Sequence, residues 1–460
     1  MLRIAIVGAG PTGFFLAEKL LTQEAMPVSV DLFERLPTPY GLVRYGVAPD
    51  HEKIRNVTRS FDKVAARTGF RFFGNIDIGR HLTLEDLRSA YHQICFTTGA
   101  QTDRQMGIPG EDLPGSHAAT EFVAWYNGHP DYRDCVFDLS AERVGVVGVG
   151  NVAVDVARML CRTPEELATT DIADHALEAL RQSQVREVYL LGRRGPAQAA
   201  FTNPEVKELG ELDGADVTAR PEEVALDPLT EAMLAREPDP TTRKKIDILT
   251  GYSQRQRSGK SRLLTLRFLV SPVALVEKNG RIGAMRLVRN TLVEGPDGEL
   301  KAQATELMEE LPVELVFRSV GYRGVAVPGL PFDERRGIIP HVAGRVIDPS
   351  APERTPVNGF YVAGWIKRGP SGVIGTNKPD AAETAESMMA DAGEGRSLSP
   401  TVEDIQPLLA SRQPDLVTWP EWVRLAEHEA GLGKAQGRPR VKHTTIDEML
   451  SIIRGKSRDF

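Results

Sequence analysis

Three glycines near the start of the chain are spaced for binding a pyrophosphate. Gly8, Gly10 and Gly13 follow the apolar run RIAIV, and a helical pattern follows them. In such a turn the first glycine permits a tight bend, the second lets the pyrophosphate approach the backbone, and the third lets the helix pack on the strand. The helix N-terminus, with Pro11 and Thr12 in its first turn, then offers free N–H groups to the phosphates.

An acidic residue follows at the spacing expected for a ribose contact. Glu34 ends the next predicted strand, about twenty residues after Gly13. Its carboxylate can accept hydrogen bonds from both ribose hydroxyls, and it repels a 2′-phosphate. This site is therefore predicted to hold a dinucleotide without that phosphate, either FAD or NAD. The alternative interpretation is a purely structural turn.

A second set of the same kind lies at Gly148, Gly150 and Ala153, after the run RVGVV. Arg193 and Arg194 stand at the end of the following predicted strand, where the first set has an acid. Two guanidinium groups can form bidentate, charge-assisted hydrogen bonds with a 2′-phosphate. This site is predicted to prefer NADP(H), unless the arginines belong only to a solvated turn.

Two nucleotide sites of opposite charge preference suggest electron transfer from NADPH to a bound flavin. A disulfide as acceptor would need two cysteines close in sequence, but Cys95, Cys135 and Cys161 are widely separated. A basic run with one acidic residue could attract an acidic redox partner, or could be an ordinary solvated surface. Its cations are Arg243, Lys244, Lys245, Arg255, Arg257, Lys260, Arg262 and Arg267.

The elements that must position these residues repeat a strand–helix–strand order. Apolar strands are predicted at RIAIVG, VSVDLFE, RVGVVG and EVYLLGRR, with helices after each glycine turn. The fold class is therefore α/β, with two Rossmann-like dinucleotide-binding domains. Gly- and Pro-rich crossings are predicted at 107–116 and 319–332, and short helices after residue 397.

Composition limits the class of protein. The chain has 460 residues, 41% of them hydrophobic and 26% charged, with a formal net charge of −7. This favours a globular protein and disfavours a surface built for nucleic acid or an acidic membrane. The sequence has no apolar run of membrane length and no recognisable signal peptide, so we expect a cytoplasmic protein. The spacing of Cys and His does not match a metal site, so we expect no metal. We favour a monomer.

Four longer stretches resemble the adrenodoxin-reductase type of ferredoxin–NADP reductase. They are TPYGLVRYGVAPDH, GNVAVDVAR, GRRGPAQAAFT and VAGWIKRGPSGVIGTNKPDA, in family order across residues 1 to about 390. The resemblance implies electron transfer from NADPH through FAD to a separate ferredoxin, an acidic iron–sulfur protein, in two one-electron steps. It implies an FAD domain of residues 1–108 and 325–400, an inserted NADP domain of 109–324, and a helical extension of 401–460.

The resemblance also assigns site residues. FAD contacts are expected at Gly8, Gly10, Pro11, Thr12, Gly13, Glu34, Leu42, Ile78, Gly364, Trp365, Gly372, Val373 and Ile374. NADP contacts are expected at Gly150, Asn151, Val152, Arg193, Arg194, Glu205 and Gly372. His51 and Glu208 match positions near the family's active centre and are expected to tune it or handle protons, although each could be structural.

Some interpretations stay open. Pro204 departs from the family pattern and could shift the start of the helix that carries Glu205. Lys367 and Arg368 are further candidates for partner docking. The alternatives to a ferredoxin reductase are an NADPH reductase of quinones or other acceptors, the electron-input subunit of a larger complex, and a non-enzymatic FAD/NADP sensor.

Overall fold

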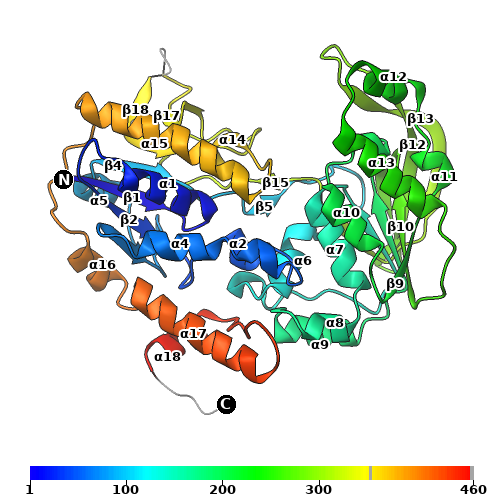
Figure 1. Ribbon diagram of the computed structural model, residues 1–460, viewed down its shortest axis with the longest axis horizontal. Coiled ribbons are helices and arrows are strands. Elements are labelled where there is room, and N and C mark those ends of the chain that lie inside the picture. Colours follow the sequence, from blue (N-terminus) through cyan, green and yellow to red (C-terminus); the bar gives the residue numbers. More distant parts are fainter. Residues whose placement is uncertain (352–354, 456–460) are drawn as a thin grey trace. The chain divides into compact units, whose positions relative to one another are not determined.

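The computed structural model describes residues 1–351 and 355–455, which form two compact units (Figure 1). Unit 1 contains Met1–Thr102, Asn127–Pro130 and Gly321–Phe460, and unit 2 contains Asp103–Tyr126 and Asp131–Val320. The chain therefore leaves unit 1 after Thr102, passes briefly through it again at Asn127–Pro130, and returns to it at Gly321 after completing unit 2. This confirms the predicted α/β class with one unit inserted into a discontinuous other.

Among the described residues, the main sheet of unit 1 has seven strands in the order β16-β17-β18-β4-β1-β2-β3. The five strands from β18 to β3 are parallel. The strands are β1 (Leu2–Val7), β2 (Val28–Phe33), β3 (Phe70–Phe73), β4 (Gln93–Phe96), β16 (His341–Val342), β17 (Arg345–Ile347) and β18 (Pro356–Val362). A small ribbon pairs β5 (Thr102–Asp103) with β15 (Tyr322–Arg323).

The helices of unit 1 come from both ends of the chain. The first group is α1 (Pro11–Thr22), α2 (Leu42–Tyr45), α3 (Glu52–Arg55), α4 (Thr58–Ala65) and α5 (Leu84–Ala90). The second is α14 (Trp365–Arg368), η3 (Ile374–Thr376), α15 (Asn377–Gly393), α16 (Gln406–Arg412), α17 (Trp419–Ala435) and α18 (Ile446–Ile453). Capping boxes at Thr418 and Thr445 start α17 and α18, because each threonine and a glutamate three residues later satisfy each other's backbone N–H groups.

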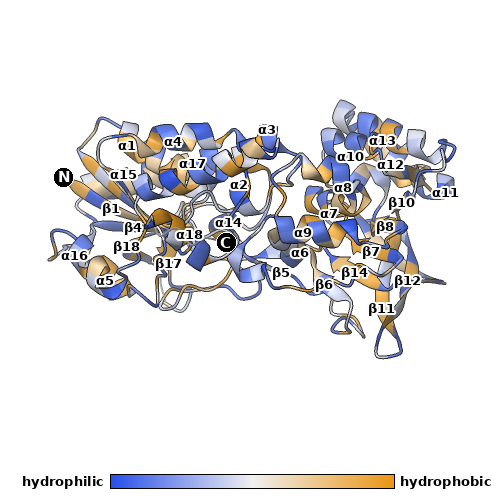
Figure 2. Ribbon diagram, turned by 90° about the horizontal axis from the view of Figure 1, so that it is seen from below, coloured by the Kyte–Doolittle hydropathy of each residue, from blue (hydrophilic) through white to orange (hydrophobic). Residues whose placement is uncertain are grey.

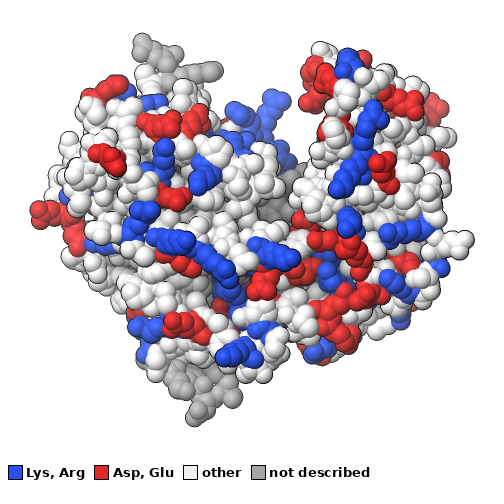
Figure 3. Space-filling model, in the orientation of Figure 1, with Lys and Arg blue, Asp and Glu red and all other residues white. Residues whose placement is uncertain are grey.

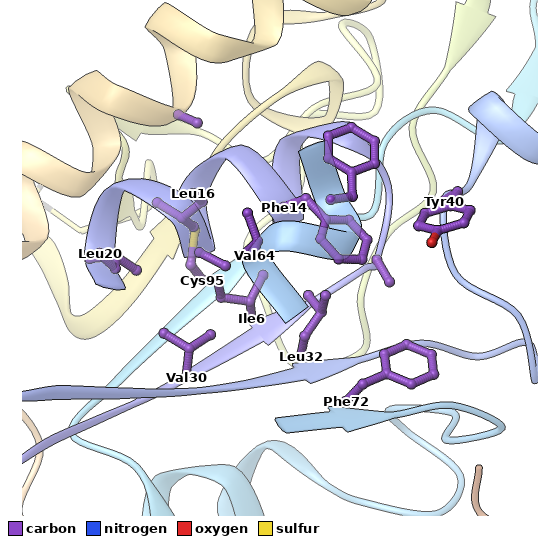
Figure 4. Close-up of a cluster of buried hydrophobic side chains, with 14 of the residues drawn as sticks. Ile6, Phe14, Leu16, Leu20, Val30, Leu32, Tyr40, Val64, Phe72 and Cys95 are labelled. Atoms are coloured by element: carbon purple, nitrogen blue, oxygen red, sulfur yellow. The ribbon is translucent and has the colours of Figure 1, made fainter. Parts of the chain in front are cut away.

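The core of unit 1 forms where α1 packs on the parallel strands. Phe14, Ala17 and Leu20 recur every three residues along α1, and they share one buried cluster with Val30 and Leu32 of β2 (Figure 4). The same cluster takes in Trp422, Leu425 and Met449 from the C-terminal helices. Residues after 400 are therefore part of the core that supports the first glycine turn.

Unit 2, as far as the structure describes it, has a six-stranded parallel sheet in the order β6-β14-β7-β8-β10-β9. These strands are β6 (Ser116–Ala118), β7 (Arg143–Val147), β8 (Glu187–Leu191), β9 (Ala215–Ala219), β10 (Arg262–Arg267) and β14 (Leu315–Arg318). An antiparallel sheet of β11 (Val270–Lys278), β12 (Arg281–Glu294) and β13 (Leu300–Leu311) shares a core cluster with β7, β8 and β14. Figure 2 shows hydrophobic residues concentrated along these strands.

The helices of unit 2 connect the parallel strands. They are α6 (Ala119–Tyr126), α7 (Asn151–Cys161), α8 (Pro164–Ala168), α9 (Asp174–Arg181), α10 (Asn203–Leu209), α11 (Pro221–Val224), α12 (Pro228–Arg236) and α13 (Pro240–Ser253), with short 3-10 turns η1 (Pro130–Tyr132) and η2 (Pro196–Gln198). In the described part of the chain, no helix combines the length and apolar character needed to cross a bilayer.

Candidate functional site

The first glycine turn joins β1 to α1 and is built from close backbone contacts. Gly8 has φ +111°, and a Cβ there would lie 2.6 Å from the carbonyl oxygen of Thr97. A Cβ on Gly13 would lie 2.2 Å from the carbonyl oxygen of Gly8. A Cβ on Gly10, in contrast, would meet no described heavy atom within 4 Å. The turn thus leaves space over Gly10, at the start of α1, that suits the pyrophosphate of a dinucleotide.

The carboxylate of Glu34 lies beside this turn. It follows β2, and its oxygens accept hydrogen bonds from the N–H groups of Ala9, at 3.0 Å, and Leu36, at 3.2 Å. Burial raises the pKa of Glu34 above its ordinary value, and the two backbone donors oppose that rise. A carboxylate held beside Ala9 suits a ribose contact and would repel a 2′-phosphate.

Leu42 is brought to the same turn by the segment before it. The Tyr40 N–H donates to the Ala9 carbonyl at 2.7 Å, and Tyr40 itself has φ +85°. A Cβ on Gly41 would lie 3.2 Å from the Cα of Gly10. Helix α2 then begins at Leu42, next to the open space over Gly10.

Gly364 and Trp365 follow β18. Gly364 has φ +80°, and a Cβ there would lie 2.4 Å from Oγ1 of Thr12, in the first turn of α1. The Trp365 indole donates to the Ser371 carbonyl at 3.1 Å, and its ring centroid lies 5.6 Å from that of Tyr322. Trp365 is only partly buried, so one side of the indole can face a ligand.

The other predicted FAD contacts lie in a loop and on the opposite sheet face. Gly372 has φ +79°, Val373 is 55% exposed, and Ile374 begins η3 and packs against the core cluster of α1. The loop runs directly into α15, which packs against α1. Ile78 packs instead on the cluster that contains Val7, beyond the carboxyl end of β1.

The second glycine turn joins β7 to α7 in unit 2. Gly148 has φ +133°, and a Cβ there would lie 2.2 Å from the Ser319 carbonyl oxygen. The space over Gly150 is open to at least 4 Å among the described atoms. The Asn151 side chain accepts the Thr202 N–H at 2.9 Å, and Val152 continues the helix. This cradle also fits a pyrophosphate.

Arg193 and Arg194 follow β8 at the same edge of the sheet. Their backbone is fixed, because the Arg193 carbonyl accepts from the Asn290 side chain at 2.8 Å and the Arg194 carbonyl accepts the Leu269 N–H at 3.1 Å. Within residues 1–351 and 355–455, neither guanidinium group forms an ion pair with a carboxylate. Two cations are therefore available to a 2′-phosphate.

Helix α10 places Glu205 and Glu208 around a buried arginine. Arg158 of α7 is fully buried, and its Nη1 lies 3.3 Å from Glu205 and 3.9 Å from Glu208. Its Nη2 also pairs with Asp155 at 2.6 Å. Sequence reasoning did not single out Arg158, although the three-residue spacing from Asp155 on a helix was a usable signal.

Pro204 does not disrupt α10. The helix begins at Asn203, so Pro204 lies in its first turn, where the missing N–H has no intrahelical acceptor anyway. Glu205 stays in the first turn.

His51, the other expected active-centre residue, precedes α3 in unit 1. Its backbone N–H donates to the Ala48 carbonyl.

The expectation that the basic run and Lys367 serve as docking charges needs correction at three residues. Arg267 is fully buried between Glu223, at 2.9 Å, and Glu309, at 2.7 Å. Lys245 is buried and donates to the Ala199 carbonyl, and Lys367 is buried with Asp380 at 3.0 Å. These ammonium and guanidinium groups neutralise or bind interior acceptors and are not accessible to a partner.

The remaining cations lie in separate segments of the chain. Arg368 binds Ser371, Thr376 and Asn377, and so organises the loop that carries Gly372. The loop of Arg255, Arg257 and Lys260 precedes β10, at the edge of the parallel sheet opposite the Gly148 turn. Figure 3 shows positive and negative side chains interspersed over the face of the molecule that is in view.

Comparison with known proteins agrees with this geometry. Residues 2–191 match the family model described as pyridine nucleotide-disulphide oxidoreductase. The chain is 47% identical to the NADPH-ferredoxin reductase FprA of Mycobacterium tuberculosis, over 98% of both chains. It is 40% identical to human mitochondrial NADPH:adrenodoxin oxidoreductase, over 98% of this chain and 92% of that one.

A solved structure extends the likeness to three dimensions. The structure of M. tuberculosis FprA in complex with NADPH has 46% sequence identity and a TM-score of 0.91, covering 99% of this chain and all of that one. This chain therefore shares the fold of that structure over nearly its whole length. The chain belongs to the NADPH-ferredoxin reductase and adrenodoxin oxidoreductase family.

Proposed function

We propose that the protein is an FAD-containing NADPH:ferredoxin oxidoreductase. The observation that carries the proposal is the opposite charge beside two similar glycine turns. The first has a carboxylate at Glu34, and the second has the guanidinium groups of Arg193 and Arg194, which form no ion pair with any described residue. The first favours FAD and the second NADPH. When bound, FAD supplies the chemistry that joins a two-electron hydride donor to a one-electron acceptor.

The residues of the chain bind and orient these groups. We assign the FAD pyrophosphate to the Gly8–Gly13 turn, its ribose to Glu34, and the flavin to Trp365 and the loop around Gly372. We assign NADPH to the Gly150 turn and the arginine pair. His51 and Glu208 are assigned to proton handling, so a shifted pH profile of flavin reduction is expected for His51→Gln and Glu208→Gln.

Ferredoxin is the proposed acceptor. A relative from Mycobacterium bovis, 44% identical over 98% of this chain and 75% of its own length, is named as a probable ferredoxin and ferredoxin–NADP reductase.

Arg243 and Lys244 are exposed on the first turns of α13. The Asn203 side chain, at the start of α10, donates to the Thr241 carbonyl of α13 at 3.0 Å. Arg243 and Lys244 are the accessible members of the basic run that lie toward the Gly148 turn, so we assign them to docking.

A dithiol acceptor reaction is disfavoured by the cysteines. All three are free, and Cys95 and Cys161 are buried. Burial raises the pKa of Cys161 to about 12, and it also raises the pKa of Cys95, so both stay protonated and unreactive at neutral pH. Free thiols also suit a reducing compartment such as the cytoplasm.

Anaerobic stopped-flow spectroscopy tests the proposal. NADPH should bleach the flavin absorbance of the purified protein rapidly, NADH much more slowly, and oxidised ferredoxin should restore it. A flavin that NADPH cannot bleach would favour a redox sensor. A flavin reoxidised by a quinone and by no ferredoxin would favour another acceptor class and overturn the partner assignment.

A further inference from the structure

A buried ion pair connects the C-terminal extension to helix α2, which follows the segment that contacts the first glycine turn. Arg44 of α2 donates through Nη1 to Oε2 of Glu429 at 2.8 Å and through Nη2 to Oε1 at 2.6 Å. Both residues are buried, and Glu429 lies in α17. Such a two-bond pair fixes direction as well as distance.

Aromatic rings hold the same guanidinium group. Its carbon lies 5.3 Å from the ring centroids of Tyr45 and of Trp422 in α17. The Tyr40 ring, just before α2, meets the Trp422 ring edge-on at 5.6 Å. Helix α17 therefore contacts the α2 segment through both charge and aromatic packing.

The α2 segment cannot hold its own position. Four residues, Leu42–Tyr45, are too few for a stable isolated helix. Tyr40 keeps a left-handed backbone, which persists only where the surroundings impose it. The Tyr40 N–H donates to the Ala9 carbonyl, and a Cβ on Gly41 would lie 3.2 Å from the Cα of Gly10, so a shift of this segment would change the space over Gly10.

Glu429 is itself anchored on its far side. Its Oε1 accepts the His443 N–H at 3.0 Å, and its carbonyl accepts the Val441 N–H at 2.9 Å. Next to these, Lys442 donates to the Asn127 carbonyl at 3.1 Å. The carboxylate is thus fixed within unit 1 before it reaches Arg44.

We propose that Glu429 is a positioning residue for the FAD site: through Arg44 it holds α2 against the Gly8–Gly13 turn. The C-terminal extension thereby controls how tightly FAD is retained. This ion pair acts on the FAD site indirectly, through α2. This inference rests on the proposed function, because it takes that turn as the FAD site.

The test measures FAD binding to apoprotein by isothermal titration calorimetry, with the melting temperature of each apoprotein recorded in parallel. Glu429→Gln keeps the shape of the side chain but removes its charge, and we expect FAD to bind about tenfold more weakly. Asp391→Asn is the matched control, since Asp391 holds Arg345 at 2.7 and 2.9 Å but joins β17 to α15. Both variants should melt lower, and only Glu429→Gln should weaken FAD binding.

Glu429→Asp keeps the charge and covers the case in which Glu429→Gln does not fold. Its affinity for FAD should lie between those of the wild type and Glu429→Gln. If Glu429→Asp is the only variant that folds, it should bind FAD about threefold more weakly than the wild type. Wild-type affinity in every folded Glu429 variant would overturn the inference and leave the proposed function intact. Wild-type apoprotein that binds no FAD would overturn both.

Discussion

The two glycine turns share a backbone design but differ at two positions. In both, the first glycine has a positive φ, a Cβ on it would clash with the carbonyl oxygen just after a neighbouring strand of the sheet, and the space over the second glycine is open. At the third position the first turn has Gly13 and the second has Ala153. After the following strand, the first has a carboxylate and the second two guanidinium groups.

The two differences have different causes. A Cβ on Gly13 would lie 2.2 Å from the Gly8 carbonyl, whereas the real Cβ of Ala153 is accommodated and fully buried. The third position is therefore set by how closely the helix packs on its own turn. The charged position after the strand is the one that we assign to nucleotide selection. Packing and ligand selection can thus be altered separately.

The largest effect is expected at the third position. Gly13→Ala should lower the free energy of unfolding by about 3 kcal/mol and release FAD, because the methyl group meets backbone that cannot rotate away. Ala153→Gly, its counterpart, should cost about 1 kcal/mol and leave NADPH binding nearly intact. Chemical denaturation and flavin content measure both. Similar losses in the two variants would remove the packing distinction.

Next in size is the effect of the arginines. Arg194→Ala should weaken NADPH binding about 10- to 100-fold, because charge-assisted hydrogen bonds to the 2′-phosphate are lost, and should leave NADH binding almost unchanged. Titration of the protein with each nucleotide measures the two dissociation constants. Equal losses for NADPH and NADH would contradict the assignment of the second site.

A smaller, pH-dependent effect is expected at Glu34. The pKa of this carboxyl is raised by burial, and FAD should bind the ionised form, so FAD affinity should fall by up to about tenfold per unit as pH drops through the raised pKa. The apoprotein should show the opposite trend, since a carboxyl with a raised pKa in the folded state loses its stabilising contribution as pH rises.

Glu34→Gln is the control for that titration. The variant should bind FAD more weakly at neutral pH and lose the acidic pH dependence. Calorimetric titrations from neutral to mildly acidic pH measure both. A wild-type affinity that is flat across that range would argue against a direct ribose contact of Glu34.

The smallest effect is expected at Pro204. Pro204→Ala should change the free energy of unfolding by less than about 1 kcal/mol and leave NADPH binding unchanged, because proline in a first helical turn loses no hydrogen bond. Thermal melts and NADPH titration are sufficient. A large change in NADPH affinity would show that the start of α10 matters to the second site.

The local features were the predictable ones. Glycine turns could be located because their conformation depends on a few adjacent residues. The crossings were located less well, since unit 2 begins at Asp103, before the predicted crossing at 107–116, while the return to unit 1 at Gly321 falls within the one predicted at 319–332. The antiparallel sheet of β11–β13 was not predicted, since bulges near Pro272 and Val288 shift its alternating pattern.

Burial of charge could not be predicted from sequence. Arg267 lies in a run of cations, and only the fold shows that Glu223 and Glu309 enclose it. Arg44 likewise gives no local sign of Glu429, which is 385 residues further along the chain. Which acid pairs with which arginine depends on how the chain folds, and the charges counted along one segment do not show it.

The discontinuity of unit 1 has a consequence for synthesis. The ribosome completes Met1–Thr102 first, but β18, α15 and α17, which finish its sheet and cover its helices, emerge only after unit 2. At roughly 5–20 residues per second, the N-terminal strands wait on the order of tens of seconds for their partners. Unit 2 can fold on the nascent chain in that interval. Unit 1, and with it the proposed FAD site, is completed only after unit 2 has been synthesised.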